Sequence, residues 1–208
     1  MNAVLGWHFS TADQRLQYGD GRLIVPGETL RHEGTLVLCS RGLHASERIL
    51  DALKYAPGPY LWRVRLSGEI AASDDKLVAS ERTALWGVDA TPVLRDFARR
   101  CALDVIHLWD APPVVRQYLR TGDETIRAAA RDAARAAWAA EDAAGDAEAA
   151  AWAAAWAAGD AAAAAAAWAA EAAGAAAWDA ARDRQQRRLT ALVWAEARRN
   201  VLPSGGVL

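Results

Sequence analysis

The chain has 208 residues, a length that fits one domain with an appendage or two small domains. Its apolar fraction is 53% and its formal net charge at pH 7 is −2, so the chain as a whole has no bias toward polyanions such as nucleic acids. Cys39 and Cys101 lie far apart and form no Cys/His pattern with zinc-ligand spacing, so no metal site is expected. We expect both thiols to be buried and reduced.

No targeting or membrane segment is expected. The first ten residues lack the basic stretch and the long apolar run of a signal peptide. The alanine-rich part contains Asp160, with Glu148 and Glu171 near it, and alanine contributes little to membrane insertion. We therefore expect a soluble, cytoplasmic protein.

The first part of the chain has the varied composition of a domain with both helices and strands. Residues 3–10 have the apolar content of a strand, and two glycine-containing turns predict a hairpin within residues 17–30. Residues 34–40 form another short β-rich run. The alternation of side chains in residues 60–68 predicts a strand. One face of that strand carries Tyr60, Trp62, Val64 and Leu66.

Helices are predicted where apolar residues recur at helical spacing. Residues 49–53 have this spacing after Ser46, which we expect to cap the helix, and two prolines end it. Thr91 followed by proline is a helix start signal. A pair of prolines ends that helix, and one more short helix runs to Gly122.

The last part of the chain is dominated by alanine and tryptophan. Alanine makes up about two-thirds of residues 127–182, and nearly every residue from 123 to 200 favours helix. Tryptophans recur at intervals of 14 and 16 residues, so they return to similar helix faces. A row of tryptophans is costly to expose, which favours packing against a second copy or folding back. The expected assembly residues are Trp138, Trp152, Trp156, Trp168 and Trp178.

An alternative for this segment is low-complexity sequence that is tolerated because alanine forms helices. Together these patterns predict an α+β fold class, in which a small mixed N-terminal domain precedes long Ala-rich α-helical segments. The expected parts are an α+β domain over residues 1–122, a helical assembly segment over 123–200 and a flexible tail over 201–208.

The motif GLHASE is the strongest candidate for a site. It places His44, Ser46 and Glu47 at a strand-to-helix junction, where backbone donors can bind an anion. The alternative is a local role, in which Ser46 caps the helix and His44 makes a hydrogen bond nearby.

Acidic side chains gather between residues 69 and 76. Asp74 and Asp75 are adjacent, and paired carboxylates can bind a metal or move protons, although a solvated turn has the same composition. The chain contains no phosphate-binding Walker loop, dinucleotide GxGxxG motif or GxSxG nucleophile elbow. The missing motifs favour a non-enzymatic role.

The segments LCSRGLHAS, DKLVASERTALWGVDAT, LRDFARRCALDVIHLWDAP and YLRTGDE resemble an uncharacterised family of phage and bacterial proteins. The resemblance implies a small domain with an LCxxGLHA-type motif, followed by a variable Ala/Trp-rich tail. It also implies a phage or prophage setting, in which accessory proteins often act against host systems.

A second resemblance is to ADP-ribosyltransferase-like folds. GWHFS, GLHAS, ILDALKY and YLWRVRL occur in the order of the strands and helix of those folds. The resemblance implies NAD as a cofactor, with His8, His44, Ser46 and Tyr55 lining a nicotinamide pocket and Glu69 as the acid.

We therefore expect a non-enzymatic accessory protein that interacts with a host protein or a small ligand through its N-terminal domain. The helical tail is expected to drive self-association, with no cofactor and no membrane or nucleic-acid partner. The alternatives are an NAD-binding ADP-ribosyltransferase-like enzyme and a protein that sequesters a nucleotide signal without turnover.

Overall fold

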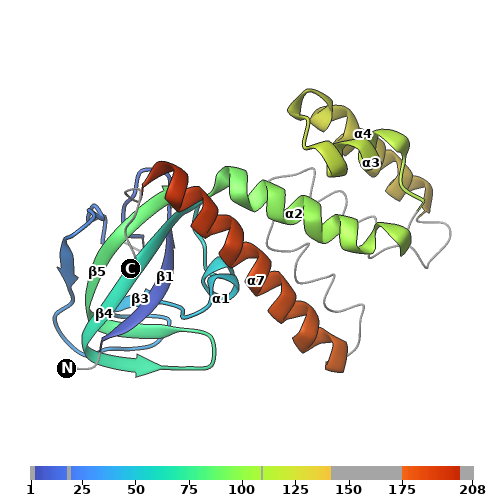
Figure 1. The fold of residues 1–208 in the computed structure, drawn as a ribbon. Coiled ribbons are helices and arrows are strands. Elements are labelled where there is room, and N and C mark those ends of the chain that lie inside the picture. Colours follow the sequence, from blue (N-terminus) through green and yellow to red (C-terminus); the bar gives the residue numbers. More distant parts are fainter. Residues whose placement is uncertain (1–2, 18–19, 109, 142–174, 202–208) are drawn as a thin grey trace. The chain divides into compact units, whose positions relative to one another are not determined.

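A computed structural model describes residues 3–17, 20–108, 110–141 and 175–201 of the chain (Figure 1). The described residues combine a five-stranded antiparallel sheet with several helices, so the content is mixed α and β. The chain forms two compact units, one from residues 1–91 with 190–208 and the other from residues 92–189.

The first unit is built on the sheet. Its strands are β1 (Val4–Ser10), β2 (Thr29–Arg31), β3 (Leu43–Ala45), β4 (Tyr60–Ala72) and β5 (Leu77–Asp89), and a short helix α1 (Ile49–Leu53) follows β3. The sheet order is β1-β4-β5-β2, and β3 pairs with the same central strand β5. β3 also reaches β1, because Trp7 and Ser46 exchange two backbone hydrogen bonds of 2.7 and 3.0 Å. The sheet therefore curls until its ends meet at one bridge.

The inner face of the curled sheet holds an apolar cluster. As predicted, Trp62, Val64 and Leu66 of β4 lie on this face, where they pack with Ile24 and Ala45. The indole of Trp62 packs closely against β5 at Gly87, which is its Cα partner on that strand and has no side chain. A Cβ atom at that glycine would lie 2.5 Å from the indole ring, so a larger residue cannot occupy the position.

The outer face of the sheet is covered by tryptophan. Trp7 of β1 and Trp86 of β5 are buried, and their ring centroids lie 5.7 Å apart. Trp194 comes from the helix α7 (Ala175–Asn200) and packs edge-on against both rings, at 6.1 and 5.3 Å. Such edge-to-face pairs stabilise a core beyond the area that they bury. The C-terminal part of α7 is thus a structural part of the first unit.

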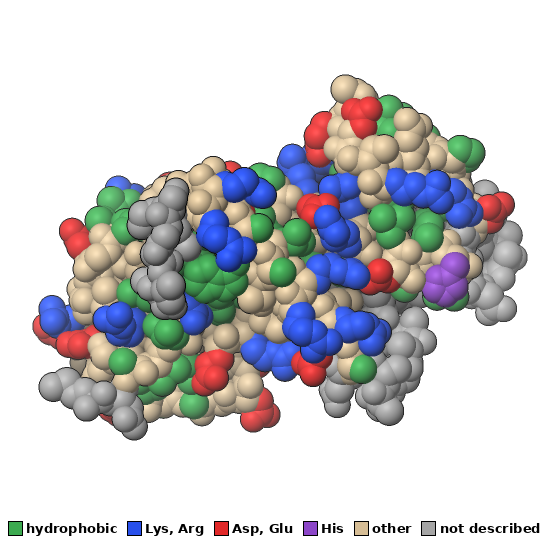
Figure 2. Space-filling model, viewed as in Figure 1, with side chains coloured by type: hydrophobic (Ala, Val, Ile, Leu, Met, Phe, Trp, Pro, Cys, Tyr) green, Lys and Arg blue, Asp and Glu red, His purple; other side chains and the backbone are tan. Residues whose placement is uncertain are grey.

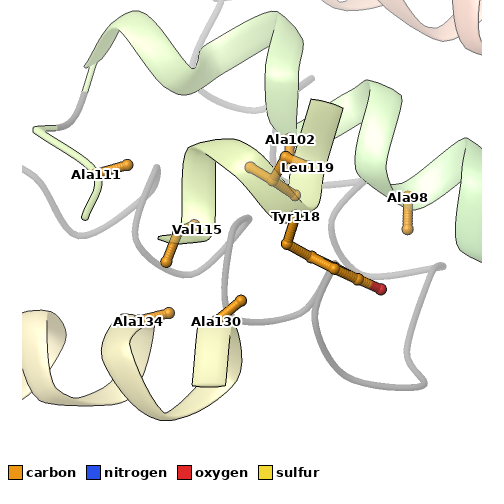
Figure 3. Packing of buried hydrophobic residues seen from close by; sticks show 8 residues of the cluster. All are labelled: Ala98, Ala102, Ala111, Val115, Tyr118, Leu119, Ala130 and Ala134. Atoms are coloured by element: carbon orange, nitrogen blue, oxygen red, sulfur yellow. The ribbon is translucent and has the colours of Figure 1, made fainter. Parts of the chain in front are cut away.

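The second unit is helical. It contains most of α2 (Thr91–Val105), α3 (Pro113–Thr121), α4 (Arg127–Glu141) and the first part of α7, with two short 3₁₀ turns at Ile106–Leu108 and Glu124–Ile126. Figure 3 shows its buried cluster, in which Tyr118 of α3 packs among alanines of α2 and α4. Ala98 and Ala130 belong to these helices, and their small side chains allow close helix packing.

Two arginines of this unit form ion pairs with carboxylates. Arg188 of α7 makes an ion pair with Asp104 of α2 at 2.7 Å, and Arg100 pairs with Asp96 at 2.8 Å. Figure 2 shows Lys and Arg side chains spread over one face of the molecule, with Asp and Glu side chains beside many of them. The face in view therefore carries both signs of charge.

Two predictions about local structure are wrong. Residues 34–40 do not form a strand, because the chain turns back between Val37 and Arg41, and Cys39 adopts a left-handed backbone conformation (φ 65°). Ser46 does not cap α1, since its backbone is bonded to β1 and Arg48 is at the N-cap position. β4 runs beyond the predicted strand of residues 60–68 to Ala72, and Asp74 and Asp75 lie in the turn between β4 and β5.

Other predictions are confirmed. α2 begins at Thr91, whose N–H donates to the Asp89 carboxylate at 2.8 Å, and α3 ends at Gly122 in a left-handed conformation with φ 67°. Glycine adopts this conformation without steric cost. None of the helices in the described part of the chain is long and apolar enough to cross a membrane.

The expected assembly residues fall mostly outside the described residues. This applies to Trp152, Trp156 and Trp168, and with them to the long alanine-rich tract. Trp138 is on α4 and Trp178 is on α7, but their side chains are outside the described part.

The tryptophan cluster generates a stability prediction. Trp194→Ala removes one ring from a three-ring cluster, so we expect the free energy of unfolding to fall by about 2–4 kcal/mol. Arg198→Ala, on an exposed position of the same helix, is the control and should change it by less than about 0.5 kcal/mol. Urea unfolding followed by tryptophan fluorescence and circular dichroism measures both, and equal stabilities would contradict the structural role of Trp194.

Candidate functional site

A buried arginine marks the inner face of the sheet. Arg82 lies in the middle of β5, with Leu66 of β4 and Leu30 of β2 as its Cα partners. It is two residues from Ala84, which belongs to the inner apolar cluster, so strand alternation directs Arg82 to the same face. The residue is only 2% exposed. Charged side chains are rarely buried to this extent unless they are paired.

The guanidinium of Arg82 is incompletely bonded. Its Nη1 donates to the backbone carbonyl of His44 at 2.6 Å, whereas Nη2 is buried and has no hydrogen-bond partner among the described residues. Burial lowers the pKa of Arg82 to about 9, and the charge of Asp20 acts against this shift. The Asp20 carboxylate is itself held by Arg22 through two bonds of 2.7 Å. Arg82 therefore remains charged at neutral pH without a carboxylate bonded to it.

His8 is a second polar residue on the face of the sheet that carries Arg82. Its Cα partner on β4 is Trp62, so His8 belongs to the inner face of the sheet. The backbone of His44 acts to raise the pKa of the His8 ring. Burial and, to a smaller extent, the charges of Arg82 and His44 nevertheless lower the pKa of His8 well below 6.5. His8 is consequently neutral at pH 7.

His44 contributes its backbone to this site and its ring to another surface. Ala45 belongs to the inner cluster, so alternation along β3 directs the His44 ring to the opposite face. There its Nε2 accepts a hydrogen bond from the N–H of Cys39 at 3.1 Å. Burial is the main cause of a lowered pKa for His44, with smaller effects from Arg82 and Lys76.

An exposed polar cluster adjoins the His44 ring. The Lys76 ammonium lies 3.1 Å from the Cys39 sulfur and 4.0 Å from the centre of the Tyr55 ring. The Tyr55 hydroxyl donates to Asp75 at 2.7 Å, and Lys54 also reaches this carboxylate. Both cysteines are free, but Cys39 is exposed, so its expected burial is wrong, whereas Cys101 is buried.

The structure brings some of the predicted site residues together and separates others. The segment of His44 and Ser46 lies beside β1, because the buried Ser46 is bonded to Trp7, the residue before His8. Tyr55 lies in the exposed cluster and approaches His44 only through Lys76 and Cys39. Glu69 is exposed on β4, where its backbone N–H donates to Ser80 at 2.9 Å.

Arg82 was not predicted from the sequence as a site residue. The residue sits in a segment whose strand character was not recognised, since residues 77–89 mix apolar, charged and small side chains. Recognising β5 would have placed Arg82 on the same face as Ala84, a residue of the inner apolar cluster. Among the described residues, no three His, Cys, Asp or Glu side chains gather as metal ligands.

The two histidines predict how stability depends on pH. Because folding lowers the pKa of His8 and His44, the unfolded chain binds more protons below pH 6.5. We expect the free energy of unfolding to fall as the pH drops from 7.5 to 5.5, by up to about 1.4 kcal/mol per pH unit for each histidine. His8→Gln should make this dependence shallower, while His107→Gln, at an exposed position, should preserve it. Urea titrations at several pH values measure the slopes, and identical slopes for His8→Gln and the parent protein would contradict this account.

Residues 9–96, which include β2 to β5 with Arg82 and His44 but not His8, match a family model described as a domain of unknown function (DUF7666). This match agrees with the resemblance to an uncharacterised family. No curated protein and no solved structure matches the chain.

Proposed function

We propose that the first unit binds a small ligand through an anionic group, which pairs with Arg82, and that the chain acts as a non-enzymatic interaction protein. The observation that carries this proposal is the buried Nη2 of Arg82, which has no hydrogen-bond partner among the described residues. The Arg82 guanidinium lies inside the first unit, on the face of the sheet that carries the apolar cluster.

The free energy of the Arg82 guanidinium differs between an empty site and an occupied one. A buried ion that lacks a partner costs several kcal/mol, because its hydration is lost and nothing replaces it. A ligand oxygen at Nη2 would supply the missing acceptor, and a charge-assisted hydrogen bond contributes about 1.5–3 kcal/mol. Guanidinium groups match carboxylate and phosphate oxygens in geometry as well as in charge.

The ligand is therefore expected to carry a phosphate or a carboxylate. Nucleotides meet this condition, which supports the hypothesis that the protein sequesters a nucleotide signal. An acidic group on a host protein meets it as well. The resemblance to phage and bacterial proteins supports an accessory role against a host system, in the cytoplasm of a bacterial cell.

An NAD-using transferase is a second candidate. The observation in its favour is the Trp7–Ser46 bridge, which brings β1 with His8 beside the segment of His44 and Ser46. This candidate requires both NAD binding and the release of nicotinamide. Calorimetry with NAD, combined with chromatography of the products, separates it from the first proposal, which requires binding without turnover.

Self-association through the alanine-rich segment is the remaining part of the proposal, and the sequence supports it. Cutting the chain at Gly122 is a poor test, because it would also remove Trp194 from the tryptophan cluster of the first unit. An internal replacement leaves that cluster in place.

The binding proposal predicts the effect of removing the guanidinium. Arg82→Met should keep the fold or stabilise it, since a buried unpaired charge is replaced by an apolar side chain of similar length. Binding of inorganic phosphate, followed by calorimetry or NMR titration, should weaken about tenfold or more. Arg65→Met, at an exposed position on the adjacent strand, is the matched control and should bind as the parent does. Unchanged phosphate affinity in a folded Arg82→Met variant would refute the proposal.

The assembly proposal predicts a change of mass. Replacing residues 142–174 with a Gly/Ser linker of equal length removes Trp152, Trp156 and Trp168 while retaining α7. Light scattering should then give the mass of a monomer, whereas the parent chain gives a multiple of it. The same oligomeric state in both proteins would rule out assembly through this segment.

A further inference from the structure

The exposed polar cluster beside the His44 ring places a thiol and an amine next to each other. The Lys76 ammonium donates to the Cys39 sulfur, and the two atoms lie 3.1 Å apart. Cys39 is in the turn between Val37 and Arg41, whereas Lys76 directly precedes β5, so the pair joins two turns that are distant in the sequence. Cys39 is exposed, and a small oxidant can therefore reach its sulfur.

Contacts on both sides hold the sulfur and the nitrogen in place. The turn that carries Cys39 is closed by two backbone hydrogen bonds of 2.8 Å, and the Cys39 N–H donates to the His44 ring at 3.1 Å. The Lys76 ammonium lies 4.0 Å from the centre of the Tyr55 ring, a cation–π contact that favours this position. The Tyr55 hydroxyl in turn donates to Asp75 at 2.7 Å. The two atoms are thus close together before any reaction.

We propose that Cys39 and Lys76 form a redox-controlled covalent crosslink, in which one oxygen atom from hydrogen peroxide joins the sulfur to the nitrogen. This inference is independent of anion binding at Arg82 and of self-association. It assigns a modification site to the exposed polar cluster, with a hydroperoxide as the class of reagent.

The reaction takes two steps, each of which consumes one molecule of peroxide. In the first, the Cys39 sulfur attacks peroxide, the O–O bond breaks, and the thiol becomes a sulfenic acid while one water leaves. In the second, an O–N bond forms between the sulfenic acid and the Lys76 amine. The O–H and N–H hydrogens that are lost pass to the second peroxide, which is reduced to two waters.

The order of the steps follows from the contacts of Lys76. Contacts with Tyr55 and with the Cys39 sulfur raise the pKa of Lys76, so its ammonium must give a proton to solvent before the nitrogen can form a bond. Oxidation of the sulfur comes first, because the thiol is the group that peroxide attacks directly. It also changes the acceptor of the ammonium, which weakens one of the two contacts that keep Lys76 protonated.

The separation of the two atoms favours an oxygen bridge over the other oxidation products. A direct S–N bond would require the atoms to close most of the 3.1 Å, whereas an inserted oxygen leaves them near their present separation. Cys101 is a poor partner for a disulfide, because it is buried and burial raises the pKa of its thiol to about 12.

The experiment treats the reduced full chain with hydrogen peroxide at pH 8 and follows the product by intact-protein mass spectrometry. The crosslink adds one oxygen and removes two hydrogens, whereas a sulfenic acid only adds one oxygen. We expect the crosslinked species to accumulate and a protease digest to contain Cys39 and Lys76 in one joined peptide. Dithiothreitol should restore the starting mass.

Two lysine variants are the matched controls. Lys76→Arg keeps the positive charge but should lose the crosslink completely, so that its reaction stops at oxidised Cys39. Lys54→Arg changes another exposed lysine of the same cluster, which contacts Asp75 at 3.2 Å, and should crosslink as the parent does. Cys101 is the internal control, because its thiol should stay free for maleimide labelling after the treated protein is unfolded.

The outcomes separate the crosslink from other oxidation products of Cys39. A joined peptide that forms in the parent, is absent from Lys76→Arg and is released by dithiothreitol supports the proposal. Only sulfenic or sulfinic acid at Cys39 in the parent, or only a dimer linked through Cys39, refutes it. A joined peptide that contains Lys54 in place of Lys76 also overturns the assignment.

Discussion

The pairing of β4 with β5 is the interaction on which the rest of the first unit depends. Each strand has thirteen residues, and their antiparallel register runs from Tyr60 opposite Asp89 to Ala72 opposite Leu77. All other strands attach to this hairpin, β1 at one edge and β2 and β3 at the other. The apolar cluster buries the inner face of the hairpin, and tryptophans cover part of the outer face. A strand with one face buried has little freedom to slip in register.

The same hairpin creates the candidate site. Its curvature brings β1 and β3 together, and Arg82 of β5 donates to the His44 carbonyl. In the second unit, by contrast, the exposed Arg100 and Arg188 each have a carboxylate partner. The unusual feature of Arg82 is thus the combination of burial and an unused donor. The position of Arg82 on β5 places its charge in the interior of the first unit. This charge contributes to the lowered pKa values of His8 and His44.

Local patterns could be predicted from the sequence where neighbours in the chain determine the structure. The alternation in residues 60–68, the helix start at Thr91 and the helix end at Gly122 all depend on side chains within a few positions, and the structure confirms them. Ser46 was assigned wrongly because a distant strand captures its backbone, and that partner is invisible in a local window. The Arg82 cluster also needs strands that are far apart in sequence. His8 and His44 could each be recognised as candidate residues from the sequence, but their position near Arg82 in the fold could not.

The packing of Trp194 against Trp7 and Trp86 has a consequence for the order of events during synthesis. The ribosome makes both sheet tryptophans more than a hundred residues before it makes the one that covers them. At typical elongation rates, the outer face of the sheet would wait roughly 5–20 seconds for its cover. A nascent chain in this interval presents an apolar aromatic surface to chaperones and to other chains. The first part of the protein to be synthesised is therefore among the last to complete its core.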